Sequence, residues 1–369
     1  MHSTKLIDRL RETPVALLGL AALALFVIWA GSEAGYPVTH WAPGGLILIA
    51  LLGVALLAVP LRLSDVPIAV RVSVLCLALF TALSYLSILW AQVPADAWEG
   101  ANRTLLYLLV FALFALWPQR GTVAALMLGA WVVAMIGLAV FVLLHINGSA
   151  TPAALFSEGR LRYPAAYENA CAAVWCVALW PALLLSSSGR VSWRLRGLLT
   201  GGAVVLADLA LLSQSRGSLF ATVVMLVLVF ALLPTRVRSL LVIAPVAIGV
   251  GASAPFVLRV GHRLLHGGDV HAAVHGATAA IFIAAVAVGL LVALGCAIEQ
   301  RLAISDAAAA RLRRAIGTVA IVALIAGIAG AWIAVGDPVA RAKHAWHTFK
   351  GGYGADNAHV DRLVSGLGS

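Results

Sequence analysis

Charged residues are scarce in this chain of 369 residues. Asp, Glu, Lys and Arg together make up 11% of it, apolar residues make up 62%, and the mean hydropathy is +1.01. Soluble domains carry about 25% charged residues, so this composition excludes a soluble globular protein and indicates a polytopic integral membrane protein. The net charge of +10 therefore matters through its distribution across a membrane, and we expect no nucleic-acid partner.

Cysteine is scarce as well, and known metal or nucleotide motifs are missing. The four cysteines lie inside apolar runs without Cys-x-x-Cys spacing, and they are Cys76, Cys171, Cys176 and Cys296. No P-loop, dinucleotide fingerprint or His-Glu-x-x-His sequence occurs. Two histidine pairs, His262 with His266 and His271 with His275, have i,i+4 spacing, but Gly267-Gly268 separates them. We interpret this region as a solvated interfacial loop and expect no metal and no cofactor.

What the chain does contain is a series of long apolar runs. Each run is long enough to be a membrane-spanning helix, and together they predict an all-α fold with about eleven spans, at 14–30, 44–60, 72–91, 104–117, 122–144, 168–186, 198–213, 218–233, 240–258, 276–297 and 315–335. We expect the first span to be an uncleaved helix, although Ala30-Gly31-Ser32 resembles a signal-peptide cleavage site.

The distribution of Lys and Arg predicts the orientation. If residues 1–13 form a cytoplasmic tail, every inner loop carries at least one cation, as the positive-inside rule requires. Residues 14–335 then form a transmembrane helical domain. Residues 336–369 form an outer, extracytoplasmic loop that looks truncated, because no apolar span follows it.

The cations placed on the outer side oppose the usual bias, and a cluster of them calls for an anionic partner. They are Arg103, Arg160, Arg162, Arg216, Arg259, Arg263, Arg341, Lys343, Lys350 and Arg362. Arginine is suited to bidentate contacts with phosphate. We interpret Arg103 and Arg341 as membrane anchors and Arg216 as functional, because small polar residues rather than aromatic residues flank Arg216.

Arg216 lies where a predicted helix begins at the outer face. The positive end of the helix dipole and free backbone N–H groups are exposed there. Ser215 or Ser218 can cap this helix, and Gly217 lets a ligand approach the backbone. The helix after Glu168 has the same direction and follows Arg160 and Arg162. The two helix starts with three arginines would suit a diphosphate, if they are adjacent in space, which the pattern leaves open.

Two segments carry a resemblance to a known family. Residues 159–170 (GRLRYPAAYENA) followed by 212–217 (LSQSRG) resemble the O-antigen ligase and O-antigen polymerase superfamily of bacterial envelope glycosyltransferases. The resemblance covers about 156–234 by motif and the rest by topology. It implies a multi-pass protein of the bacterial plasma (inner) membrane that moves a glycan from an undecaprenyl diphosphate carrier to an acceptor hydroxyl at the outer face, without a metal or nucleotide sugar.

The resemblance also implies roles for individual residues. Arg216 would contact the diphosphate together with Ser215 and Gly217, Arg160 or Arg162 would assist, and Asn169 would shape the site. Family members carry a histidine base for the acceptor near the end of the large outer loop, where this chain stops. His359 is the candidate base here, although its order relative to Asn357 differs from the family pattern.

Two acidic residues, Asp208 and Glu168, each have two possible interpretations from the sequence. Asp208 lies inside an apolar span, where a carboxylate is either functional or has a hydrogen-bond partner on a neighbouring helix. Glu168 either positions an arginine or is an ordinary charge at a helix start.

Two other functional classes also stay open. These are a polysaccharide or lipid transporter (flippase) and a non-catalytic envelope assembly factor. The expected partners of the glycosyltransferase are the lipid-linked glycan donor, a glycan or lipid acceptor, and membrane lipids.

Overall fold

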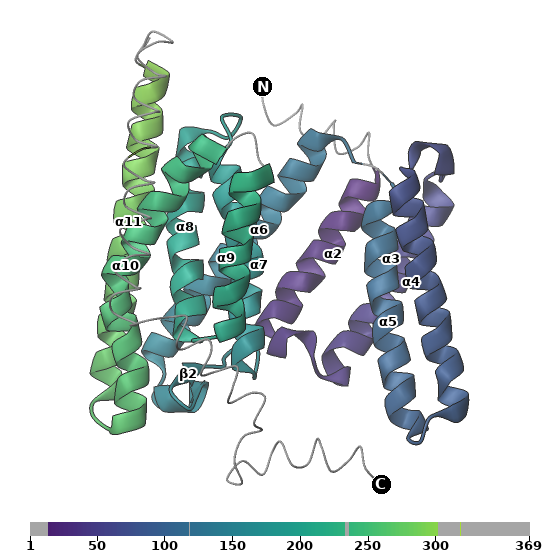
Figure 1. Cartoon of the computed structure of the whole chain (residues 1–369), viewed down its shortest axis with the longest axis horizontal. Helices are drawn as coiled ribbons and strands as arrows, with labels where there is room; N and C mark the ends of the chain where they lie inside the picture. Colours follow the sequence, from purple (N-terminus) through teal and green to yellow (C-terminus); the bar gives the residue numbers. More distant parts are fainter. Residues whose placement is uncertain (1–13, 118, 233–235, 302–317, 319–369) are drawn as a thin grey trace. The chain divides into compact units, whose positions relative to one another are not determined.

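The computed structural model describes residues 14–117, 119–232, 236–301 and 318 (Figure 1). The chain divides into two compact units, Met1–Ala303 and Ile304–Ser369, and of the second unit only Thr318 is described. Several sequence predictions therefore lie outside the described residues: the tail 1–13, the span 315–335, the outer loop 336–369, and the candidate base His359.

The described chain is almost entirely helical. Its ten α-helices are α2 (Pro14–Gly31), α3 (Val38–Ala58), α4 (Ile68–Leu86), α5 (Pro94–Ala115), α6 (Gly121–Gly148), α7 (Glu168–Ser187), α8 (Trp193–Leu212), α9 (Arg216–Leu232), α10 (Arg236–His266) and α11 (Val270–Arg301). They correspond in order to the first ten predicted spans. Among the described helices, seven are long and apolar enough to cross a membrane, while α2 and α9 are apolar but shorter. A multi-pass membrane protein is supported, whereas the count of eleven spans is not confirmed.

Helix ends differ from the apolar runs that predicted them. Helix α5 begins at Pro94 instead of near residue 104, with Pro94 in its first turn and Asp96 close behind, both of which favour a helix start. Helix α10 extends from Arg236 to His266, beyond the predicted 240–258. An apolar run marks only the part of a helix that contacts hydrocarbon, so polar turns at either end are not included in it.

A small β-hairpin is the exception to the predicted all-α fold. Strand β1 (Phe156–Ser157) pairs antiparallel with β2 (Arg160–Leu161). The two turn residues, Glu158 and Gly159, have φ values of 46° and 74°, as in the tight turns that match strand twist. Strands of two residues are too short to show an alternating pattern, so the sequence did not predict this hairpin within the otherwise helical fold.

Four short 3-10 turns complete the described secondary structure: η1 (Glu33–Gly35), η2 (Leu63–Asp65), η3 (Ser87–Trp90) and η4 (Pro152–Leu155).

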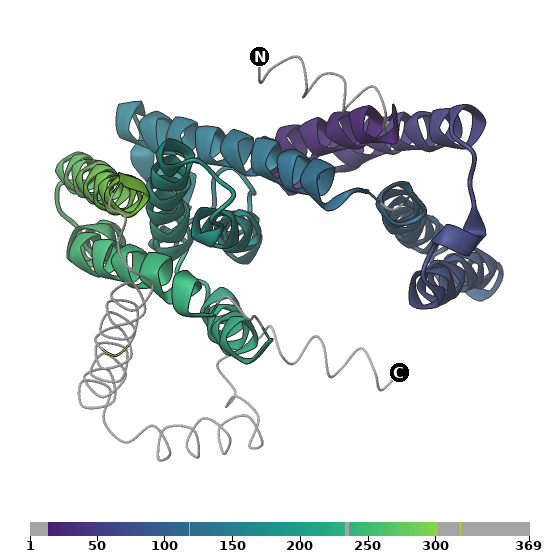
Figure 2. The same ribbon diagram turned by 90° about the horizontal axis from the view of Figure 1, so that it is seen from above.

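Helix α8 lies at the centre of the main buried cluster. It packs against α6, α7, α10 and α11, and Ala203, Val204, Leu206 and Leu209 are fully buried. The view from above shows α10 and α11 (green) side by side at the edge of this group (Figure 2). A second buried cluster joins α2, α3 and α5. The connections between these packed helices carry the candidate site.

Helices α8 and α11 approach each other closely through glycine. A Cβ atom added at Gly201 would lie 2.7 Å from the Ala285 carbonyl oxygen, and one added at Gly289 would lie 2.9 Å from the Gly197 carbonyl oxygen. Small residues of this kind allow helix backbones to approach within a membrane, where close packing replaces the hydrophobic effect as the driving force.

Candidate functional site

Connections from distant parts of the sequence meet at one end of the helices. We call this end the loop face. It contains the α2–α3 connection (32–37), the α6–α7 connection (149–167) and the α8–α9 turn (213–215). The Glu33 N–H donates to the Pro164 carbonyl at 3.0 Å. The Gln214 amide donates to the Gly159 carbonyl at 3.2 Å. The structure thus brings together the two segments whose adjacency the sequence left open.

The α6–α7 connection carries Arg160 and Arg162. Arg160 in β2 pairs with Glu158 at 3.0 Å. Glu168, the first residue of α7, is only 8% exposed; its carboxylate accepts a hydrogen bond from Ser157 and interacts electrostatically with both arginines. Glu168 therefore acts on these arginines electrostatically, without an ion pair to either of them among the described residues, and both of its predicted roles stay predictions.

Arg162 and Asn169 lie on the exposed side of the same connection. The Arg162 guanidinium donates to the Ala154 carbonyl at 3.4 Å and borders a pocket of about 450 Å³ together with Glu33 and His40. The Asn169 amide donates to the Tyr167 hydroxyl.

The α8–α9 turn presents Arg216. Ser215 is buried, and its Oγ accepts the Ser218 N–H at 3.2 Å, so Ser215 is the residue that caps α9. Arg216 begins α9 and is exposed. A Cβ atom added at Gly217 would meet only the Ser215 Oγ, at 3.9 Å. The space above this helix start is therefore open to a ligand.

Helices α7 and α9 begin close together at the loop face. The Cys171 thiol in the first turns of α7 contacts the Ser213 hydroxyl just before α9, and one turn further on the Cys176 thiol contacts Thr222. Two positive helix-dipole ends thus lie near each other, which favours an anion.

The three arginines differ in how much of their charge is opposed. Glu158 and Glu168 counter Arg160, and Glu168 also acts on Arg162. For Arg216, no ion pair occurs within the part of the chain that the structure describes. Of these three arginines, Arg216 is consequently the one whose charge is least opposed.

An aromatic pocket beside this site was missed by the sequence analysis. It has a volume of about 760 Å³, and Tyr167 and Arg103 both border it. The full lining is Trp29, Glu33, Ala34, Gly35, Tyr36, Trp41, Arg103, Leu106, Tyr107, Ala165, Ala166, Tyr167 and Ala170. Pockets that combine apolar walls with a few polar groups are typical of ligand sites.

Arg103, which we interpreted as a membrane anchor, has several partners within the protein. Its guanidinium pairs with Glu99 at 2.7 Å, donates to the Tyr36 carbonyl at 3.3 Å and lies 4.5 Å from the Tyr36 ring centroid. Arg103 therefore contacts protein groups. The Glu99–Arg103 spacing of four residues was the available signal, because α5 extends through both residues.

Asp208 has a partner on a neighbouring helix. Its side chain is fully buried in α8, and the Ser253 hydroxyl of α10 donates to its carboxylate at 2.9 Å. This geometry matches the structural alternative, a hydrogen bond that joins α8 to α10. Its hydrogen-bond partner belongs to the helix group rather than to the loop face, so we do not include Asp208 in the site.

The four histidines near Gly267-Gly268 lie on helices, which corrects their assignment to a loop. His262 and His266 end α10, His271 and His275 begin α11, and the two glycines between them have positive φ, as the predicted helix break requires. Among the described residues, no group of three or more His, Cys, Asp or Glu side chains is arranged to hold a metal ion.

Gly261 allows the hairpin and the α8–α9 turn to meet α10. A Cβ atom there would lie 2.8 Å from the Gly159 carbonyl oxygen and 2.6 Å from the Gln214 amide nitrogen. Gly261→Ala is therefore expected to reduce stability by about 1–2 kcal/mol through overpacking, measured as a lower unfolding temperature in detergent. The matched control is Gly251→Ala, also in α10, where no atom lies within 4 Å. Equal stability of the two variants would contradict this account.

Comparisons of the chain with protein-family models, with curated proteins and with solved structures each find no match.

Proposed function

We propose that this protein is a membrane glycosyltransferase of the O-antigen ligase type. It would transfer a glycan from an undecaprenyl diphosphate carrier to an acceptor hydroxyl at the outer face of a bacterial plasma membrane, as a ligase or a polymerase. The observation that carries the proposal is the exposed Arg216 at the capped start of α9, beside the start of α7. The loop face would then be extracytoplasmic, which agrees with the orientation expected from the positive-inside rule.

The diphosphate would bind where the charges favour it. Arg216 and the first N–H groups of α9 would contact it directly, with Ser215 holding the helix start and Gly217 leaving room for the oxygens. Arg160 and Arg162 would approach from the α6–α7 connection, held by Glu168, and Asn169 would border the site.

The proposed reaction is a displacement at the anomeric carbon of the glycan. The acceptor oxygen forms a bond to this carbon, the bond to the diphosphate oxygen breaks, and undecaprenyl diphosphate leaves with the electron pair. Arginine cations placed near the leaving oxygens stabilise the charge that develops there. A base must take the acceptor proton; His359 is our candidate for this role, and it lies outside the described residues. No metal or cofactor enters this scheme.

The aromatic pocket is suited to the sugar next to the diphosphate. Tyr167 borders the pocket, and its hydroxyl accepts the hydrogen bond from Asn169, so the pocket adjoins the proposed diphosphate site. Tyr36, Trp41 and Tyr107 offer apolar ring surfaces, and Arg103 and Glu33 offer polar groups for sugar hydroxyls.

Binding of the carrier lipid tests the proposal. The purified, detergent-solubilised chain should bind an undecaprenyl diphosphate analogue about tenfold more tightly than undecaprenyl monophosphate, because the second phosphate adds charge-assisted hydrogen bonds. Equal affinity for the two lipids, or binding to neither, would count against the enzyme. Substrate-dependent flux across vesicles would then favour a transporter or flippase, and the absence of flux would favour a non-catalytic envelope assembly factor.

A further inference from the structure

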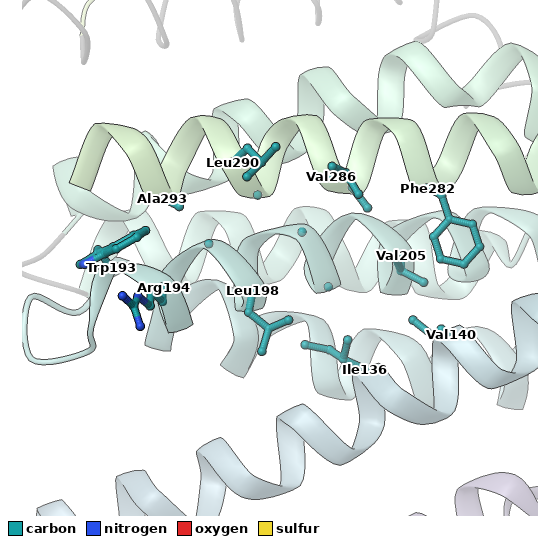
Figure 3. A pocket seen from close by; sticks show the side chains of 15 residues that line it. Ile136, Val140, Trp193, Arg194, Leu198, Val205, Phe282, Val286, Leu290 and Ala293 are labelled. Carbon is teal, nitrogen blue, oxygen red and sulfur yellow. The ribbon is translucent and has the colours of Figure 1, made fainter. Parts of the chain in front are cut away.

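An apolar groove lies between α6, α8 and α11, separate from the loop face. Its volume is about 450 Å³, and Figure 3 shows side chains from all three helices facing into it. Ile136 and Val140 come from α6, Leu198 comes from α8, and Val286 and Leu290 come from α11. Nothing in the proposed glycosyltransferase reaction uses this groove.

The groove exists because glycines, which have no side chain, form its floor. Gly197 and Gly201 of α8 and Gly289 of α11 lie at the close helix contact and also line the groove. Leu198 and Val286 on its walls are 53% and 58% exposed. In a membrane these side chains would contact hydrocarbon, so the groove is open to lipid.

One end of the groove carries a positive charge. Figure 3 shows Trp193 and Arg194 at this end and Phe282 at the other. Arg194 is exposed, and its guanidinium lies 5.1 Å from the Trp193 ring centroid. Within the residues that the structure describes, no carboxylate pairs with Arg194. A tryptophan and an arginine at a helix start are typical of the boundary between hydrocarbon and headgroups.

The length of the groove matches one leaflet. Along α11 the lining runs from Phe282 to Ala293, which corresponds to about 16 Å at the helical rise of 1.5 Å per residue. A hydrocarbon core about 30 Å thick provides about 15 Å per leaflet. An acyl chain lying in the groove would therefore place its headgroup beside Arg194.

We propose that this groove binds an anionic phospholipid, with one acyl chain along the glycine floor and the phosphate against Arg194. Basic pockets between membrane helices favour anionic headgroups in this way. The carrier lipid is a poor fit, because Arg194 is near the start of α8 whereas Arg216 follows its other end. The inference therefore does not rest on the proposed glycosyltransferase function.

Native mass spectrometry of the purified full chain tests the proposal. The probe lipid is either phosphatidylglycerol or phosphatidylcholine. The unmodified chain should retain phosphatidylglycerol preferentially. Arg194→Gln should reduce that preference about fivefold, the effect expected for one cation at the headgroup level. The control is Arg190→Gln, because Arg190 is exposed on the α7–α8 connection, four residues before Arg194, but does not line the groove.

A second variant tests the acyl-chain part independently. Val286→Trp should fill the groove and lower the retention of both lipids, with no change in folding because the side chain starts from an exposed position. Retention of phosphatidylglycerol by both variants at the level of the unmodified chain would overturn the proposal. A Val286→Trp chain that changes only its oligomeric mass would also overturn it and would identify the groove as an interface between two copies.

Discussion

Replacing Arg216 by alanine is expected to weaken binding of undecaprenyl diphosphate by roughly tenfold to a hundredfold, the range for one hydrogen bond to a charged group. The variant should fold normally, because Arg216 is exposed and Ser215 still caps α9. Affinity for the monophosphate should change less, so the preference between the two lipids should fall. Arg216→Lys should be intermediate, since lysine keeps the charge but loses the bidentate geometry. The measurement is the dissociation constant of each lipid for each variant.

The matched control for Arg216 is Arg259→Ala. Arg259 is an exposed cation of α10 on the outer side of the predicted topology, with its guanidinium 5.5 Å from the Phe256 ring centroid. Arg259 lies outside residues 159–170 and 212–217, which carry the family resemblance, and its replacement should leave diphosphate binding unchanged. An equal loss in both variants would mean that the lipid responds only to total surface charge, and an unchanged preference in Arg216→Ala would remove Arg216 from the site.

Replacing Gly201 by leucine is expected to destabilise the helix group by about 3 kcal/mol or more, at the upper end of overpacking effects. The added Cβ atom would lie 2.7 Å from the Ala285 backbone oxygen, and a backbone atom cannot rotate away as a side chain can. Helices α8 and α11 would have to separate, which would disturb the main buried cluster. The check is the unfolding temperature in detergent together with the fraction of protein that elutes as a single species.

Gly295→Leu serves as the comparison for Gly201. Gly295 is in α11, the partner helix of this contact, is exposed, and would place its Cβ atom in open space. It should keep an unfolding temperature close to that of the unmodified chain. Similar losses in both variants would point to a general intolerance of leucine in place of glycine in α11 and α8, rather than to the close backbone approach.

The candidate site was predictable in its parts but not in its assembly. Arg216 and Ser215 stood out because a small polar cluster interrupts two apolar runs, and this is a local feature of the sequence. The hydrogen bond from Gln214 to Gly159 joins residues 55 positions apart, and no local pattern reports such a contact. The aromatic pocket was missed for the same reason, since Tyr36 and Arg103 are 67 positions apart.

The sequence by itself determined the membrane class and the order of the ten described helices, and it predicted which arginines lie on the outer side. It could do so because hydropathy over about twenty residues and the position of a charge are local properties. Only the tertiary structure decided which polar groups meet across the fold: Asp208 of α8 meets Ser253 of α10, and Gln214 meets the Gly159 carbonyl. It also decided where glycine allows backbones to meet. Both depend on helix packing, in which side chains from distant segments compete for the same space.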